Sequence, residues 1–327
     1  MNQNFLRFLV CFLMGTLLLS HAAPAIADTE KPWPLRPITL VVPFPAGGSI
    51  DAIGRLLGDR LSKELGQPII ISNRPGTNGS LASDAVARAV PDGYTLILTS
   101  IGTHAINPLV NPRVRYDAKR DFTHISMVAQ TANVLLASLS FGGKTLEDVV
   151  AQDKIKPLNV AITGYGSSNH VAMALFRQTA HLRLNEVVYK GDAVALNDML
   201  NGQVDLMFVN YLAALPHIKA NRLRALAVTA AARSELLPDV PTMSEAGFEV
   251  AIEAWIGLAA PANLPAPIAE RLSSLVRKIL LTQDMQERLA AGGASVIPSI
   301  PQEATSHIAE EIAKWTKVVR AAQIVSE

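Results

Sequence analysis

Cysteine is nearly absent from this chain of 327 residues, in which Cys11 is the single example. Cys11 lies inside an apolar segment near the N-terminus, so we expect the processed protein to contain no thiol. That absence excludes disulfide bonds, thiolate catalysis and cysteine-based metal sites. An excess of one charge is also lacking, because 29 basic residues face 28 acidic residues. A nearly neutral chain is a poor candidate for binding nucleic acid or an anionic membrane.

Long apolar runs are missing as well, apart from one segment at the N-terminus. Phe8 to Leu19 is apolar but too short to span a membrane comfortably. Arg7 precedes this segment, and a small-residue site that ends at Ala27 follows it. The arrangement predicts a secretory signal peptide over residues 1–27, with cleavage after Ala27. Roughly 300 residues then remain, which is enough for two domains of ordinary size.

Short β-branched runs alternate with amphipathic helical patterns through most of the chain. The expected strands are 38–42, 68–71, 94–99, 158–163, 186–189, 204–209, 223–229 and 295–297. The expected helices are 53–65, 81–90, 146–151, 170–179, 194–200, 211–221, 267–289 and 301–322. Strands that alternate with helices predict an α/β fold with doubly wound parallel sheets.

The segments that follow the expected strands are the candidate site, because open α/β sheets bind ligands beyond the carboxyl ends of their strands. These segments are rich in glycine, hydroxyl and amide residues at the starts of expected helices, a combination that suits an anion. They cover residues 43–51, 73–80, 100–104, 164–170, 190–192 and 210–211. A single glycine-rich turn often serves chain reversal alone, but their number here favours a ligand clamp.

Motifs for phosphate binding and catalysis are missing or incomplete. Gly143-Lys144-Thr145 ends like a P-loop, but Ser138 stands where that motif needs its first glycine. No serine fits the G-x-S-x-G elbow, and the histidines have no metal-ligand spacing. We therefore expect no enzyme, no cofactor and no metal site. Two alternatives stay open: a serine nucleophile beside His170, and a carboxylate pair among Asp51, Asp192 and Asp205.

Several motifs together carry a resemblance to a known family. In chain order they are WPLRPI from Trp33, VVPFPAGGSID from Val41, NRPGTNGS from Asn73, PDGYTLIL from Pro91, VVYKG from Val187, GQVDLMFVN from Gly202, LRALAVT from Leu223 and LPDVPTMSEAG from Leu237. With this order and spacing the chain resembles the TctC/Bug family, the periplasmic substrate-binding proteins of tripartite tricarboxylate transporters. The resemblance extends from about Trp33 to Trp315.

The resemblance implies a type II periplasmic binding fold, in which two lobes close about a hinge. Lobe 1 would comprise residues 28–127 plus 244–327, and lobe 2 residues 128–243. The protein would be a monomeric solute receptor of the periplasm that delivers a small carboxylate to the permease subunits of such a transporter. The carboxylate would be a di- or tricarboxylate, an amino acid or an aromatic acid. Two alternatives are a binding protein that signals to a sensor kinase and, with less support, a secreted hydrolase.

The resemblance also implies which residues bind the ligand. From the first lobe they are Phe44, Gly47, Gly48, Ser49, Asp51, Gly76, Asn78, Gly79 and Ser100. From the second lobe they are Gly166, Ser167, Ser168, His170, Tyr189 and Asp205. Ile50, Asn78 and Asp192 depart from the usual family pattern. We expect the carboxylate grip to be kept and the preference among carboxylates to differ.

Overall fold

A mixed ten-stranded sheet organises the computed structural model, which describes residues 33–324. The strand order is β2-β1-β3-β9-β4-β7-β5-β6, and β8 and β10 also pair with β4. The strands are β1 Ile38–Val42, β2 Ile69–Asn73, β3 Thr95–Ser100, β4 Phe122–Ser138, β5 Asn159–Ile162, β6 Asn185–Val188, β7 Leu206–Asn210, β8 Leu223–Val228, β9 Glu253–Pro261 and β10 Ala294–Val296. All eight expected strands are confirmed. The expected signal peptide lies outside the described residues.

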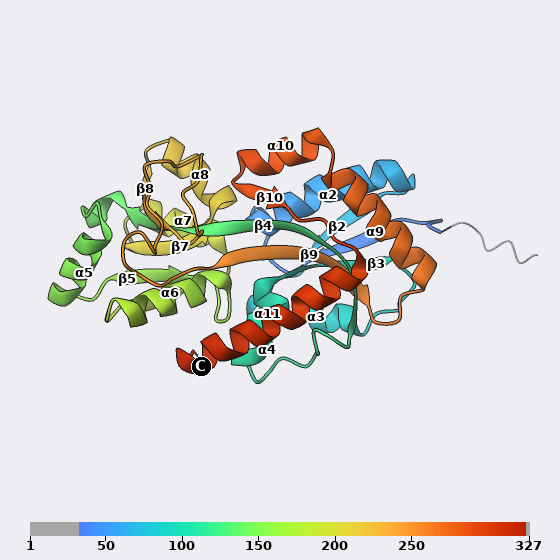
Figure 1. Ribbon diagram of the computed structural model, residues 1–327, viewed down its shortest axis with the longest axis horizontal. Coiled ribbons are helices and arrows are strands. Elements are labelled where there is room, and N and C mark those ends of the chain that lie inside the picture. Colours follow the sequence, from blue (N-terminus) through green and yellow to red (C-terminus); the bar gives the residue numbers. More distant parts are fainter. Residues whose placement is uncertain (1–32, 325–327) are drawn as a thin grey trace, which may run out of the picture. The chain divides into compact units, whose positions relative to one another are not determined.

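The sequence reading missed β4 and β9, the two long strands that run side by side between the parallel groups (Figure 1). The sequence pattern did not predict β4, because polar residues interrupt its apolar run. The structure satisfies these residues from other elements: Ser126 Oγ accepts from the Ser299 N–H at 3.1 Å, and Thr131 Oγ1 donates to the Gly293 carbonyl at 2.9 Å. Such long-range partners leave no periodic signal in the sequence.

The polarity of the strands places the carboxyl ends of two parallel groups opposite each other. β2, β1 and β3 are mutually parallel, and so are β7, β5 and β6. β4 is antiparallel to β9 along residues 122–132 and to β7 along residues 133–137. β9 is in turn antiparallel to β3, so the two parallel groups run in opposite directions and are displaced along β4. The carboxyl ends of both groups therefore point toward the middle of β4.

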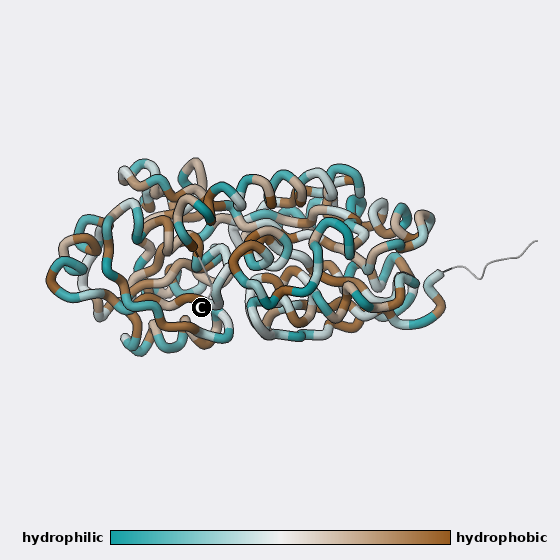
Figure 2. Tube along the Cα trace, turned by 90° about the horizontal axis from the view of Figure 1, so that it is seen from below, coloured by the Kyte–Doolittle hydropathy of each residue, from teal (hydrophilic) through white to brown (hydrophobic). Residues whose placement is uncertain are grey.

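Helices follow most strands and cover the apolar strands of the sheet, and the outer turns of the chain are mostly hydrophilic (Figure 2). They are α2 Ser49–Leu65, α3 Ser80–Ala87, α4 Asn107–Val110, α5 Leu146–Ile155, α6 Ser168–Thr179, α7 Asp192–Leu200, α8 Tyr211–Lys219, α9 Ala266–Leu280, α10 Gln283–Ala291 and α11 Pro301–Ala321. Short helical turns lie at η1 Thr77–Gly79, η2 Gly102–Ile106 and η3 Leu139–Phe141.

One expected helix is wrong in its extent. The pattern over 267–289 predicts a single helix, but the structure has α9 and α10 with a break between them. Thr282 causes the break, because its side chain caps α10 by accepting from the Met285 N–H. A threonine that hydrogen-bonds the backbone in this way favours a new helix start over continuation of the old one.

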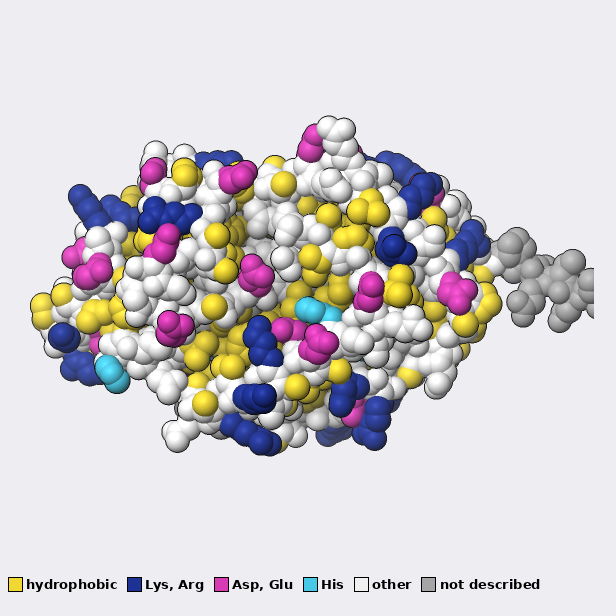
Figure 3. Space-filling view, viewed as in Figure 1, with side chains coloured by type: hydrophobic (Ala, Val, Ile, Leu, Met, Phe, Trp, Pro, Cys, Tyr) yellow, Lys and Arg dark blue, Asp and Glu magenta, His cyan; other side chains and the backbone are white. Residues whose placement is uncertain are grey.

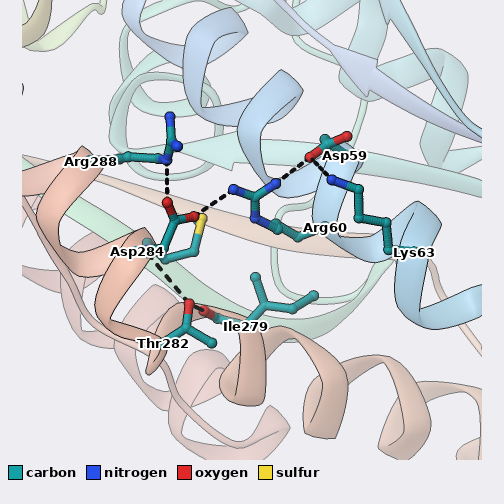
Figure 4. Close-up of polar contacts among 8 residues, drawn as sticks. Asp59, Arg60, Lys63, Ile279, Thr282, Asp284 and Arg288 are labelled. Carbon is teal, nitrogen blue, oxygen red and sulfur yellow. Dashed lines mark hydrogen bonds and ion pairs between the residues drawn. The ribbon is translucent and has the colours of Figure 1, made fainter.

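The C-terminal helices return to the first part of the chain through ion pairs (Figure 4). Arg60 on α2 contacts Asp59 and donates to Asp284 on α10 at 2.5 Å. Lys63 and Arg288 extend the same network, at 2.9 Å from Asp59 and 2.6 Å from Asp284. These exposed charges join α2 to α10 but add little stability each.

The surface agrees with the balanced charge of the sequence. Basic and acidic side chains are interspersed over the face shown in Figure 3. Within residues 33–324, no helix has the length and hydrophobicity needed to cross a membrane.

Candidate functional site

The loops after β1, β2 and β3 meet the loops after β5, β6 and β7 around a cavity of about 860 Å³. This volume falls within the range of about 300–1,000 Å³ that small-molecule sites occupy. Thr131 of β4 and Trp255 of β9 also line it, since both strands pass between the two groups. We call the loops after β1, β2 and β3 the near side and the loops after β5, β6 and β7 the far side.

The β1–α2 loop on the near side is braced by Asp51. Gly47 has a φ of 85°, which glycine adopts readily, and donates its N–H to Asp51 Oδ2 at 2.9 Å. Asp51 also accepts from Arg55 Nε and from Asn73 Nδ2, both at 2.9 Å. Burial raises the pKa of Asp51, but these hydrogen bonds outweigh burial and leave that pKa below its ordinary value. Asp51 and Gly47 hold the loop in shape and do not line the cavity.

Ser49 presents the clearest binding group of this loop. It is the first residue of α2, it lines the cavity and it is only 4% exposed. Its Oγ has no hydrogen-bond partner within the described part of the chain. Gly48, the N-cap residue, carries no side chain that would cover the first turn, and Phe44 provides an apolar wall. A partnerless hydroxyl at the positive end of a helix suits an anion.

The β2–η1 loop carries a second partnerless group, the Asn78 amide. Thr77 and Asn78 have φ values of 46° and 50°, in the left-handed region that asparagine tolerates better than most residues. Both amide atoms of Asn78 lack a partner among the described residues. Gly79 has no room for a side chain, because a Cβ there would lie 2.6 Å from Thr103 Cγ2 and 2.9 Å from Pro43 Cβ.

The segment after β3 adds Ser100 and Asn107. Ser100 Oγ and Thr103 Oγ1 lie 3.3 Å apart, so the Ser100 hydroxyl has a partner within its own loop. Asn107 is 1% exposed and lines the cavity, and its Nδ2 donates to the Thr77 carbonyl at 3.0 Å. Its Oδ1 accepts no hydrogen bond from any described residue. The sequence reading missed Asn107 because it predicted no helix between β3 and β4.

Far-side hydroxyl and amide groups bond to one another. Ser167 Oγ caps α6 by accepting from the His170 N–H at 3.1 Å. Ser168 Oγ donates to Asn169 Oδ1 at 3.3 Å, and Asn169 Nδ2 donates to Thr163 Oγ1 at 3.0 Å. Of these residues, Ser167, Ser168, Asn169 and Thr163 line the cavity, and His170 does not.

His170 serves the frame of the far side and does not line the cavity. Its Nδ1 accepts from the Gly166 N–H at 3.2 Å, and its Nε2 lies 3.9 Å from Glu186 Oε2. Burial, together with the positive charge of Arg177, lowers the pKa of His170 to about 4. A neutral ring that accepts a backbone N–H is not the general base that a neighbouring serine nucleophile needs. Gly166 also lies outside the lining, with a φ of 76°.

Tyr189 and Asp205 differ in where they lie. The residue Tyr189 lines the cavity, but its hydroxyl donates to Asp198 Oδ2 at 2.8 Å. Burial and the Asp198 carboxylate raise the pKa of Tyr189 to about 12. Asp205 precedes β7, where Oδ2 accepts from the Asn159 N–H at 2.8 Å at the opening of β5. It therefore lies at the amino ends of the far-side strands, away from the cavity.

The structure thus brings most, but not all, of the predicted site residues to one cavity. Those that line it are Phe44, Gly48, Ser49, Gly76, Asn78, Gly79, Ser100, Ser167, Ser168 and Tyr189. Those that do not are Gly47, Asp51, Gly166, His170 and Asp205. Lining residues outside the predicted set include Thr77, Asn107, Asn111, Thr131, Thr163, Asn169, Asp192, Asn210 and Trp255. The rule that ligands bind beyond the carboxyl ends of strands identifies five of them as candidates, because they end strands or follow them: Thr77, Thr163, Asn169, Asp192 and Asn210.

The charged groups of the lining are sparse. Arg113 and Lys190 contribute to it, but both are exposed residues. Asp192 is partly buried. Backbone N–H groups, hydroxyls and amides therefore dominate the polar interior. No group of His, Asp and Glu residues between positions 33 and 324 is arranged to hold a metal ion.

Glycines bring the two sides into contact. A Cβ added to Gly164 would lie 3.4 Å from Asn78 Cβ, and one added to Gly191 would lie 3.0 Å from Pro45 Cγ. At Gly166 an added Cβ would lie 2.9 Å from Asn107 Cα. The near and far sides therefore lie close together at three glycines, with the cavity between them.

Known proteins of similar sequence and structure share this architecture. The family model for the tripartite tricarboxylate transporter family receptor, TctC, matches residues 53–324. BugT of Bordetella pertussis is 36% identical over 322 residues, which are 97% of this chain and 98% of BugT. Rpa4515 of R. palustris, solved with adipate, is 35% identical with a TM-score of 0.87, over 90% of this chain and 99% of that one. MatC (Rpa3494) from Rhodopseudomonas palustris, solved with bound malate, is 35% identical with a TM-score of 0.84, over 88% and 100%. The predicted α/β fold of two-lobed periplasmic binding proteins is confirmed.

Proposed function

Because the chain belongs to the TctC family of tripartite tricarboxylate transporter receptors, we propose that it binds a small carboxylate in the cavity between the near and far sides. Rpa4515 and MatC, solved with adipate and malate, support this class of ligand. The protein then acts as a solute receptor and not as an enzyme. Its cavity is suited to holding a solute, since the His170 ring is engaged with the backbone of its own loop.

The observation that carries the proposal is Ser49 at the start of α2. Its buried, partnerless Oγ and the uncovered first turn of the helix supply donors to an anion. A phosphate or sulfate carries more charge and is usually met by arginine or lysine as well. Here the cations of the lining, Arg113 and Lys190, are exposed, so a carboxylate fits the interior better.

The two sides belong to two lobes in this proposal, with residues 28–127 plus 244–327 in lobe 1 and 128–243 in lobe 2. β4 joins them, because its partner changes from β9 to β7 between Ala132 and Asn133. If the lobes open about β4, then Gly164, Gly166 and Gly191 move away from the near side. Affinity then reflects the contacts that only the closed form makes.

Delivery to a membrane permease completes the proposed role. The chain works as a monomer in the periplasm after removal of residues 1–27, and its closed form docks on the permease subunits of a tripartite tricarboxylate transporter. Family membership supports this partner.

The test is ligand binding by the purified protein after refolding to remove carried-over solute. A thermal-shift panel of di-, tri-, amino and aromatic acids should give a rise of several degrees, because saturation at 100 times Kd stabilises by about 2.7 kcal/mol. Ser49→Ala should weaken every bound carboxylate alike, by about tenfold to a hundredfold, since it removes a hydrogen bond to a charged group. Ser306→Ala, at an exposed serine of α11, is the matched control. Equal affinity in Ser49→Ala and the control would remove this loop from the binding site.

A further inference from the structure

Asp192 is the one acid among the described residues that line the cavity. It is the first residue of α7 and is partly buried. A carboxylate side chain in a site that binds carboxylates is unfavourable unless it contacts another part of the ligand, because like charges repel strongly in a partly desolvated cavity. The residues around Asp192 indicate which ligand group it contacts.

Neutral neighbours hold the Asp192 side chain. Asn169 Nδ2 donates to Asp192 Oδ1 at 3.4 Å, and the Thr163 hydroxyl also hydrogen-bonds to the carboxylate. Asn169 is itself fixed, because its Oδ1 accepts from Ser168 Oγ at 3.3 Å. Burial raises the pKa of Asp192, and the hydrogen bonds from Thr163 and Asn169 offset part of that rise. Within residues 33–324, no arginine or lysine forms an ion pair with Asp192.

A second acceptor in the lining has no donor among the described residues. Asn107 Oδ1 on the near side has no partner among the described residues, and Asn107 is 1% exposed. Closure brings the far-side loop onto the near side at the residue before Asp192, where Gly191 meets Pro45. The cavity thus presents two acceptors, Asp192 and Asn107 Oδ1, in addition to the donors at Ser49 that suit a carboxylate.

The walls between these polar groups are largely apolar. Phe44, Ile101, Val188, Ile256 and the indole-bearing Trp255 all contribute to the lining. A ligand that fills the cavity therefore has a hydrocarbon body and displaces the water around Asp192. A carboxylate that loses this water needs hydrogen bonds from the ligand in return.

Resting on the proposed function, we propose that Asp192 selects carboxylates whose far end donates a hydrogen bond, as an ammonium or a hydroxyl group does. Ser49 and the first turn of α2 bind the carboxylate of the ligand, and Asp192 accepts from its other end. A hydrocarbon end leaves the desolvated Asp192 with only its hydrogen bonds from Asn169 and Thr163, and a second carboxylate adds repulsion. Sites built to hydrogen-bond a ligand group discriminate strongly against analogues that lack it.

The experiment uses ligands that differ only at the far end. Hexanoate, 6-hydroxyhexanoate, 6-aminohexanoate and adipate share a six-carbon chain and end in a methyl, hydroxyl, ammonium or carboxylate group. Butyrate, 4-hydroxybutyrate, 4-aminobutyrate and succinate repeat the series on four carbons. Titration calorimetry of the purified full chain should give amino and hydroxy acids at least tenfold lower Kd than hexanoate and adipate, or than their four-carbon equivalents.

Asp192→Asn tests the assignment, with melting temperature as the check that the variant is folded. It should reduce the advantage of the amino acid by at least tenfold and improve binding of the diacid. Asp239→Asn, at an exposed acid outside the lining, should leave the order unchanged. Asp192→Ser provides a second variant that removes the charge.

Three outcomes overturn the proposal. Equal affinities across each series mean that no group reads the far end. If the protein prefers the diacid and loses that preference in Lys190→Met, then Lys190, and not Asp192, selects the far end of the ligand. Binding of none of the eight acids, with no hit in the wider carboxylate panel, overturns the proposed function as well, so the two failures are distinguishable.

Discussion

The two sides of the cavity have similar loop sequences but use their polar groups differently. On the near side, Ser49 Oγ and both amide atoms of Asn78 lack partners among the described residues. On the far side, Ser167 caps α6, and His170 accepts the Gly166 N–H. The near side therefore offers its groups to a ligand, whereas the far side uses many of its groups to fix its own frame.

Residue type alone therefore does not identify a binding group. Ser49 and Ser167 both stand at helix starts after glycine-containing turns. Ser167 is the N-cap of α6, so its Oγ faces the backbone N–H of His170, whereas Ser49 is already inside α2. One position along the helix start decides whether the hydroxyl serves the helix or the cavity.

The largest expected effect tests the hydrogen bonds that far-side residues make to one another. His170 has a folded-state pKa of about 4, below the ordinary value of 6.5. Between these values the unfolded chain binds more protons, so stability is complete above pH 6.5 and falls as pH is lowered toward 4. The loss from this group amounts to about 3 kcal/mol. His170→Asn keeps an acceptor for the Gly166 N–H and should remove that share of the slope.

Urea unfolding at pH 7 and at pH 4.5 measures the change. Other groups contribute to the remaining slope, since burial lowers the pKa of His104 and His124 and hydrogen bonds lower that of Asp51. His181→Asn is the matched control, because His181 is exposed and has a φ of 53° that asparagine accepts. If His170→Asn and His181→Asn retain the same pH dependence, His170 is not part of a buried frame.

The next effect tests the contact between the two sides. Gly166→Ala places a Cβ 2.9 Å from Asn107 Cα and from Val110 Cγ2, so the closed arrangement is disfavoured while the open one is not. We expect about a tenfold loss of affinity for the best carboxylate, which corresponds to about 1.4 kcal/mol. Calorimetric titration measures it, with unfolding of the ligand-free protein as the companion measurement.

Gly142→Ala separates this steric effect from backbone strain. Gly142 has a φ of 79°, close to the 76° of Gly166, and a Cβ there meets nothing within 4 Å. Both variants should lose about 1 kcal/mol of stability from the left-handed conformation. Only Gly166→Ala should lose affinity, and equal affinities in the two variants would show that closure does not depend on this contact.

Much of the fold was predictable because parallel strands and their helices leave local patterns. β1 and β3 are apolar runs bounded by turns, and the loops that follow them are recognisable by their glycines. β4 was not predictable, because polar residues such as Ser126 are satisfied by residues far along the chain, in this case by the Ser299 N–H. The site was predictable as a set of loops, while the partner of each side chain was not. The family resemblance implies Asp51 and Ser167 as ligand-binding residues, and only the structure shows that both bond to their own loops.

The smallest expected effect comes from a change on α2 away from the cavity. It tests whether only the first turn of this helix matters for binding. Arg60 stands on the outer part of α2 and pairs with Asp284 of α10 (Figure 4). Exposed ion pairs contribute little and weaken further in salt, so Arg60→Gln should change the melting temperature by only about a degree. Carboxylate affinity should equal that of the unmodified protein in low and high salt. A loss of affinity here would mean that the attachment of α2 to α10, and not only its first turn, sets the position of Ser49.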